Sequence, residues 1–81
     1  MKVKILYFSS IKDKIKKREE ILEIPENTTV YQLVKILEKK YPDISDPLHT
    51  VMIAVNEEYV DNETELKEGD IIAIIPPVSG G

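Results

Sequence analysis

One segment of this 81-residue chain has the pattern of a long amphipathic helix, and it constrains the fold more than any other feature. Thr29 and Gln32 have the spacing of a capping box, and Pro42 marks the end of the segment. The apolar residues between them recur at helical spacing as Val30, Leu33, Val34, Leu37 and Tyr41. A single helix of this length can cover only one face of a sheet.

Strands bounded by turns account for most of the remaining chain. The expected strands are residues 3–8, 19–24, 51–55, 59–60 and 71–75. Residues 9–17 are ambiguous and allow a helical turn, whereas residues 43–50 are typical of a polar loop. This order predicts an α+β fold of the β-grasp (ubiquitin-like) type, a mixed sheet with one main helix packed on one face. We expect residues 1–75 to form this domain and residues 76–81 to form an extended C-terminal tail.

Two of the expected strands are apolar on both faces, which one helix cannot cover. Alternate apolar side chains of residues 71–75 point to opposite faces, and in the first strand Leu6 and Phe8 lie opposite the other apolar residues. A partner protein is the economical cover for the second face, because large exposed apolar patches usually mark interfaces. Two alternatives stay open: residues 9–18 or 42–50 fold over this face, or the curl of the sheet hides it.

The composition excludes several kinds of site. Because the chain has no cysteine, it has no disulfide, thiolate metal site or cysteine nucleophile. The only histidine, His49, has no second histidine or cysteine with which to share a metal, and the acidic residues 61–70 lack EF-hand spacing. We therefore expect this chain to bind no metal and no cofactor. It has neither an apolar run of membrane-spanning length nor a signal-peptide pattern, so we expect a cytoplasmic protein without membrane contact.

Charge is unevenly distributed along the chain, whose net charge is −4. Residues 1–18 hold seven basic residues and one acidic residue, whereas residues 19–81 hold four basic and fourteen acidic residues. The basic block at residues 12–18 contains no aromatic residue that could stack on a base, so we expect a solvated loop and no nucleic-acid partner. The acidic remainder favours a basic partner surface.

The final glycines, Gly80 and Gly81, are the group with the most unusual chemical prospect. Two glycines at a free carboxyl terminus are thin enough to enter an active site that excludes any residue with a Cβ. Pro76 and Pro77 lie just before them, where they end the last strand and keep the exit extended. We therefore expect a tail that presents its own carboxylate to another protein's active site. The alternative is a frayed terminus with chance glycines.

Three stretches of the sequence carry a resemblance to a known family. They are residues 53–60, residues 66–70 and the ending Ile74-Ile75-Pro76-Pro77-Val78-Ser79-Gly80-Gly81. Over its whole length the chain resembles the small subunits of molybdopterin synthase, and the ending is the most specific part of this resemblance. One departure is Ile75, because the residue before the two prolines is often aromatic in that family.

The resemblance implies a sulfur carrier with a non-catalytic, sulfur-donating role in a synthase complex. An adenylating enzyme of the ubiquitin-activating type would use ATP to adenylate Gly81, and a sulfur donor system would convert the adenylate to a thiocarboxylate. The tail, with Gly80 next to its end, would enter the large subunit and donate sulfur to the cyclic pyranopterin precursor. The expected assembly is a heterotetramer of two small and two large subunits. The residues implied in partner binding are Phe8, Ile75, Pro76, Pro77, Val78 and Ser79.

Two other functions would use the same adenylated tail. One is sulfur carriage for thiamin synthesis or tRNA thiolation, and the other is a ubiquitin-like modifier joined to proteins by isopeptide bonds. The proline pair and the chain length argue against the thiamin type. The tail alone does not separate a sulfur carrier from a modifier.

Overall fold

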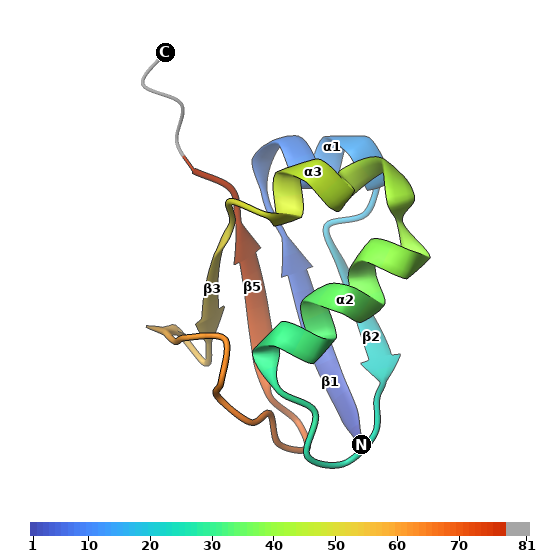
Figure 1. The fold of residues 1–81 in the computed structure, drawn as a ribbon. Coiled ribbons are helices and arrows are strands. Elements are labelled where there is room, and N and C mark those ends of the chain that lie inside the picture. The colour runs from blue at the N-terminus through green and yellow to red at the C-terminus, as the bar shows by residue number, and fades with distance from the viewer. Residues whose placement is uncertain (78–81) are drawn as a thin grey trace.

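The computed structural model describes residues 1–77, which form a five-stranded mixed sheet with helices packed against it (Figure 1). The strands are β1 (Lys2–Tyr7), β2 (Glu19–Glu23), β3 (Met52–Val55), β4 (Glu58–Tyr59) and β5 (Ile71–Ile75). The helices are α1 (Ser9–Ile15), α2 (Val30–Lys40), the short 3₁₀ helix η1 (Pro42–Ile44) and α3 (Ser45–Leu48). This element order confirms the α+β, β-grasp prediction.

The first and last strands lie side by side near the middle of the sheet, whose order is β2-β1-β5-β3-β4. β1 and β5 are parallel, and the other pairs are antiparallel. In the parallel pair Tyr7 lies opposite Ile74, so both strands end at the same edge of the molecule (Figure 1). The segments that follow Tyr7 and Ile74 therefore start close to each other.

Helix α2 begins at the predicted capping box. The Thr29 side chain accepts the Gln32 N–H at 3.2 Å, and the Gln32 side chain accepts the Thr29 N–H at 3.0 Å, so two helix-end donors are satisfied. The helix ends before Tyr41 and Pro42. The residues of α2 that face the sheet and are fully buried are Val30, Leu33 and Leu37.

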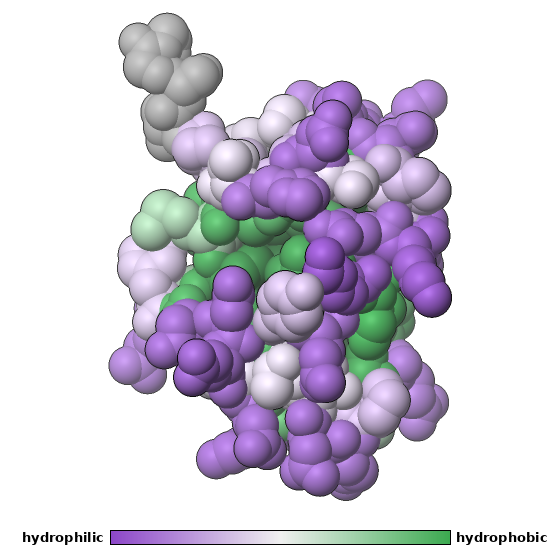
Figure 2. Space-filling view, viewed as in Figure 1, coloured by the Kyte–Doolittle hydropathy of each residue, from purple (hydrophilic) through white to green (hydrophobic). Residues whose placement is uncertain are grey.

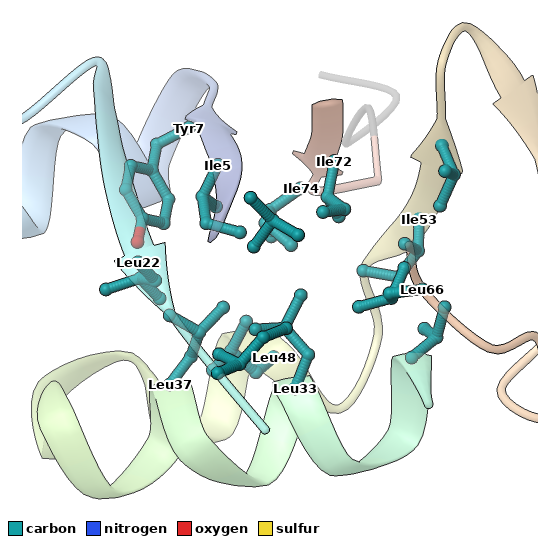
Figure 3. Close-up of a cluster of buried hydrophobic side chains, with 14 of the residues drawn as sticks. Ile5, Tyr7, Leu22, Leu33, Leu37, Leu48, Ile53, Leu66, Ile72 and Ile74 are labelled. Carbon is teal, nitrogen blue, oxygen red and sulfur yellow. The ribbon is translucent and has the colours of Figure 1, made fainter. Parts of the chain in front are cut away.

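The core fills the space between α2 and the sheet (Figure 3). Ile5 and Tyr7 of β1 meet Ile72 and Ile74 of β5 in this layer, and Leu66 closes it from the loop before β5. Leu66 is buried and anchors this loop to the core. Full burial of one aliphatic side chain stabilises the fold by about 1.5–3 kcal/mol, so this layer is the main source of stability.

Residues 43–50 are not the polar loop predicted from the sequence. They form η1 and α3, and Ile44 and Leu48 are buried in the core while the polar side chains between them face outward. Two apolar residues four positions apart were the helical signal here. Residues 9–17 contain helix α1 with Ile11 fully buried, as the helical reading of this segment allowed.

Both connecting segments pack on the side of the sheet that carries α2. α1 contacts η1, and η1 and α3 contact α2. Neither segment therefore covers the second face, and this alternative from the sequence is excluded. None of the helices within residues 1–77 is both long and apolar enough to cross a membrane.

Candidate functional site

The face of the sheet away from α2 carries exposed apolar side chains. Phe8 and Ile71 are each 43% exposed and Met52 is 49% exposed, whereas Ile72 and Ile74 on the other face are completely buried. The exposed residues come from the expected alternation of side chains along each strand. We call the side chains of Leu6, Phe8, Ile21, Met52, Tyr59, Ile71, Ala73 and Ile75 the open face.

The pairing of strands gathers the two predicted contact residues at one end of the open face. Because Tyr7 lies opposite Ile74 in parallel strands, the next residues, Phe8 and Ile75, are neighbours at the strand ends. Met52 lies opposite Ile75 on the other side of β5. Phe8 keeps an extended backbone (φ −125°, ψ 156°) and lies at the N-cap of α1, one residue beyond the end of the strand.

Two prolines follow directly at this end of β5. Pro76 is buried and Pro77 is exposed, and neither has an N–H with which to continue the pairing. The open face therefore leads straight to the chain exit. The remaining predicted site residues, Val78, Ser79, Gly80 and Gly81, lie outside the described residues.

The start of β5 is fixed by a side-chain hydrogen-bond network that sequence reasoning did not identify. Asn56, in the turn after β3, accepts the Ile71 N–H at 3.0 Å and donates to Asp70 at 2.9 Å. Asp70 also accepts the Lys67 N–H at 2.8 Å. These contacts position the strand that ends at the prolines, and the Asn-Glu and Gly-Asp turns were the only sequence signal for them.

A half-buried carboxylate, that of Glu20, links side chains on the face of the sheet that α2 covers. Glu20 on β2 accepts hydrogen bonds from the hydroxyls of Tyr7 and Tyr41, the second at 2.7 Å. The Lys17 and Lys40 ammonium groups are each 3.3 Å from its other oxygen. Burial alone would raise the pKa of the Glu20 carboxyl, but these hydrogen bonds lower it to about 2.

The same cluster shifts the pKa values of Tyr7 and Lys17 in the opposite direction, upward. Burial raises the pKa of the Tyr7 hydroxyl, and its hydrogen bond to Glu20 adds to the effect. A hydrogen bond to Tyr41 and the contact with Glu20 raise the pKa of Lys17. The cluster therefore remains ionised as a carboxylate with cations around it at neutral pH. It ties β1 and β2 to the end of α2 and is structural.

Other candidate groups in residues 1–77 give no catalytic or metal site. His49 lies 3.7 Å from Glu38 on an exposed surface, and no three His, Cys, Asp or Glu side chains of the described part are grouped to hold a metal ion. The helix-covered side is mostly hydrophilic, with an apolar hollow between α2 and β3 (Figure 2). The apolar contacts that Phe8, Met52 and Ile75 offer suit docking rather than acid–base chemistry.

Sequence reasoning identified part of the open face and missed the rest. Phe8, Ile71 and Ile75 were found because their strands are apolar on both faces. Met52 and Tyr59 were missed, since their place on this face depends on how β3 pairs with β4 and β5. Because β3 is apolar on both faces, its sequence pattern does not show which face the helices cover.

Comparison with known proteins gives matches over nearly the whole chain. The ThiS family matches residues 5–81. A curated relative, the molybdopterin synthase sulfur carrier subunit of Dictyostelium discoideum, is 41% identical over 81 residues, which cover 96% of this chain and 94% of the relative.

Two solved structures place the fold among similar proteins. A molybdopterin converting factor subunit 1 from Pyrococcus furiosus has a TM-score of 0.88 and 32% identity, and the match covers 96% of this chain and 99% of that one. A complex of subunits 1 and 2 of the molybdopterin-converting factor from Helicobacter pylori contains a chain with a TM-score of 0.72 and 27% identity, with 100% of both chains covered.

Proposed function

This chain belongs to the ThiS family, and within it to the molybdopterin synthase sulfur carrier subunits, and on this premise we propose that it carries sulfur on Gly81. The observation that carries the proposal is the open face, which continues through Ile75 into the proline pair. A docking surface next to the segment that carries the reacting group holds that segment in register with a partner's active site. The apolar contacts supply binding, and the tail supplies the reacting group.

The proposed chemistry begins at the Gly81 carboxylate, which is a poor electrophile. An adenylating enzyme of the ubiquitin-activating type forms the acyl-adenylate from ATP and releases pyrophosphate. A sulfur donor system then displaces AMP and leaves a thiocarboxylate, a sulfur nucleophile that needs no cysteine. Gly80 is thin enough to follow Gly81 into a narrow active site.

The proposed partner is the large subunit of molybdopterin synthase, in the cytoplasm. Phe8 and Ile75 contact this subunit, and Pro76, Pro77, Val78 and Ser79 form the arm between the folded body and the active site. The large subunit supplies the acid–base groups, and the sulfur passes to the cyclic pyranopterin precursor. Two charged tails are consumed for each dithiolene, which agrees with a heterotetramer of two small and two large subunits. The Helicobacter pylori complex of subunits 1 and 2 supports this choice of partner.

The experiment that tests the proposal is intact-mass spectrometry of the chain after incubation with an adenylating enzyme, ATP and a sulfur donor. The expected result is a mass increase that equals the replacement of one oxygen by sulfur, located on the terminal peptide. A chain that ends in Ala instead of Gly81 is the matched control. Conjugates on lysines of other proteins, without any thiocarboxylate, would instead identify a protein modifier and overturn the proposal.

A further inference from the structure

The outer edge of β2 is separated from the strand that leads into Pro76 by β1. β2 is the outermost strand of the sheet on the side opposite β4. Backbone hydrogen bonds to β1 and to Met1 flank β2 at both ends. The Tyr7 N–H donates to the Arg18 carbonyl at 2.9 Å, and the Ile24 N–H donates to the Met1 carbonyl at 2.8 Å.

The backbone groups that point away from the sheet follow from this ladder. Hydrogen-bonded positions alternate along an antiparallel strand, so Glu20 and Leu22 face β1 together with Arg18 and Ile24. The N–H and carbonyl groups of Glu19, Ile21 and Glu23 therefore point outward, and no hydrogen bond within residues 1–77 uses them. Such an edge is a template for one more strand.

A hollow borders the loop that follows this edge strand. A hollow of about 720 Å³ lies on the β2 side of α2, where Ile36, Gln32 and Lys39 face the loop that begins at Pro25. Figure 2 shows apolar surface there, between α2 and β2. An added strand would turn alternate side chains toward this hollow and the others toward the open-face side of β2.

The charges on β2 decide which strand fits. On its open-face side β2 presents Glu19, the 66% exposed Ile21, and Glu23. A second copy of β2 paired antiparallel about Ile21 would bring Glu19 opposite Glu23, which is unfavourable. A strand with a basic, an apolar and a basic residue at these alternate positions is complementary, although Glu19 already lies 3.6 Å from Lys4.

We propose that the free edge of β2 binds an extended segment of a partner protein by strand addition, with basic residues opposite Glu19 and Glu23 and apolar residues toward the hollow beside Ile36. This interaction goes beyond sulfur transfer. It uses the sheet edge opposite β4, so it leaves the β5 exit free. Main-chain hydrogen bonds give the affinity, and the alternating pattern gives the specificity.

The test uses the full chain and the peptide acetyl-Thr-Lys-Val-Ile-Val-Lys-Thr-amide, with binding measured by calorimetry. The key variant is Ile21→Pro, because the lost N–H points outward and proline is tolerated at such edge positions. We expect about a tenfold loss of affinity for Ile21→Pro, against a small change for the matched control Ile21→Thr, which keeps the amide. Equal binding by folded Ile21→Pro would overturn the proposal.

Two further measurements keep the proposal testable if Ile21→Pro does not fold. In the wild-type chain, the amide hydrogen exchange of Ile21 should slow by about tenfold when the peptide saturates the protein, since this N–H becomes paired. Unchanged exchange at Ile21 in the saturated complex would refute strand addition. Glu23→Lys should also lower the affinity for this peptide relative to the affinity for a second peptide with Glu in place of Lys. The control Glu63→Lys should leave this affinity ratio unchanged. Equal changes of the ratio in both variants would refute the charge assignment.

Discussion

The two faces of strand β5 are both apolar but have opposite surroundings. In β5, Ile72 and Ile74 are completely buried beneath α2, whereas Ile71 on the other face is 43% exposed. The same residue type in one strand thus serves the fold on one side and remains available for contact on the other. The sequence of a strand that is apolar on both faces therefore does not reveal which face the chain itself covers. Where a sheet has an apolar face that no helix covers, that face indicates an interface.

The largest expected difference between the faces is in stability. Ile74→Ala removes a completely buried side chain and should lower the free energy of unfolding by about 2–5 kcal/mol. Ile71→Ala is the matched control on the open face and should cost less than about 1 kcal/mol, because its side chain is partly in water already. Urea denaturation measures both, and equal losses would contradict the assignment of the two faces.

The carboxylate cluster makes the covered side sensitive to acid. The folded pKa of Glu20 is about 2, below its ordinary value of 4.5, so its contribution to stability is present above pH 4.5. It should decline as the pH falls from about 4.5 through 2. At neutral pH it should stay below the roughly 3 kcal/mol of the full shift, because solvent screens this partly exposed cluster. The check is urea denaturation at several pH values for the wild type and Glu20→Gln.

In this experiment the wild type should lose its advantage over Glu20→Gln as the pH falls through that window. Glu23→Gln, at an exposed position on the same strand, is the control and should follow the wild-type curve. A constant difference between wild type and Glu20→Gln at every pH would show that ionised Glu20 does not stabilise the fold.

Charged substitutions on the open face should weaken binding to the partner and leave the stability of the fold nearly unchanged. Phe8→Glu or Ile75→Glu should weaken binding to the large synthase subunit by about tenfold to a hundredfold, because a charge would be buried in an apolar contact. Calorimetric titration gives the affinity, and thermal unfolding should change little. Tyr31→Glu, at an exposed aromatic position on α2, is the control and should bind normally. Equal affinities for all three variants would remove the open face from the interface.

The fold was predictable because its main signals are local. The capping box at Thr29, the apolar stripe of α2 and the alternation in β5 depend on residues close together in sequence. The prediction of a polar loop at residues 43–50 was wrong because polar residues there outnumber the two buried ones, Ile44 and Leu48. The burial of these two residues depends on contacts of η1 and α3 with α2. Tertiary contacts of this kind outweigh local polarity.

The candidate site was predictable in part for the same reason. Phe8 and Ile75 stand out in apolar strands, but that they lie together follows from the parallel pairing of β1 with β5. Met52 reaches the open face only through the register of β3. The Glu20 cluster joins residues from three elements, and no sequence pattern links Glu20 with Tyr7 and Tyr41.

The smallest expected effect concerns the hairpin beside the open face. Glu57 has a φ of 72° in the turn between β3 and β4, a left-handed conformation that costs a side chain with a Cβ about 1 kcal/mol or more. Glu57→Gly should therefore raise the free energy of unfolding by roughly 0.5–1 kcal/mol after the entropy cost of glycine is subtracted. Glu58→Gly, inside β4, should lower it, and urea midpoints compare the two. A loss of stability in Glu57→Gly would contradict the turn geometry.

The measurement that tests the central claim most directly is sulfur transfer by a chain from which Gly81 has been deleted. The assay combines this chain with the large subunit, the adenylating enzyme, ATP, a sulfur donor and the pyranopterin precursor, and it quantifies the dithiolene product. We predict normal thermal unfolding, normal binding to the large subunit and no product, because the folded body only docks while the terminal carboxyl reacts. Product formation at the wild-type rate would contradict this account.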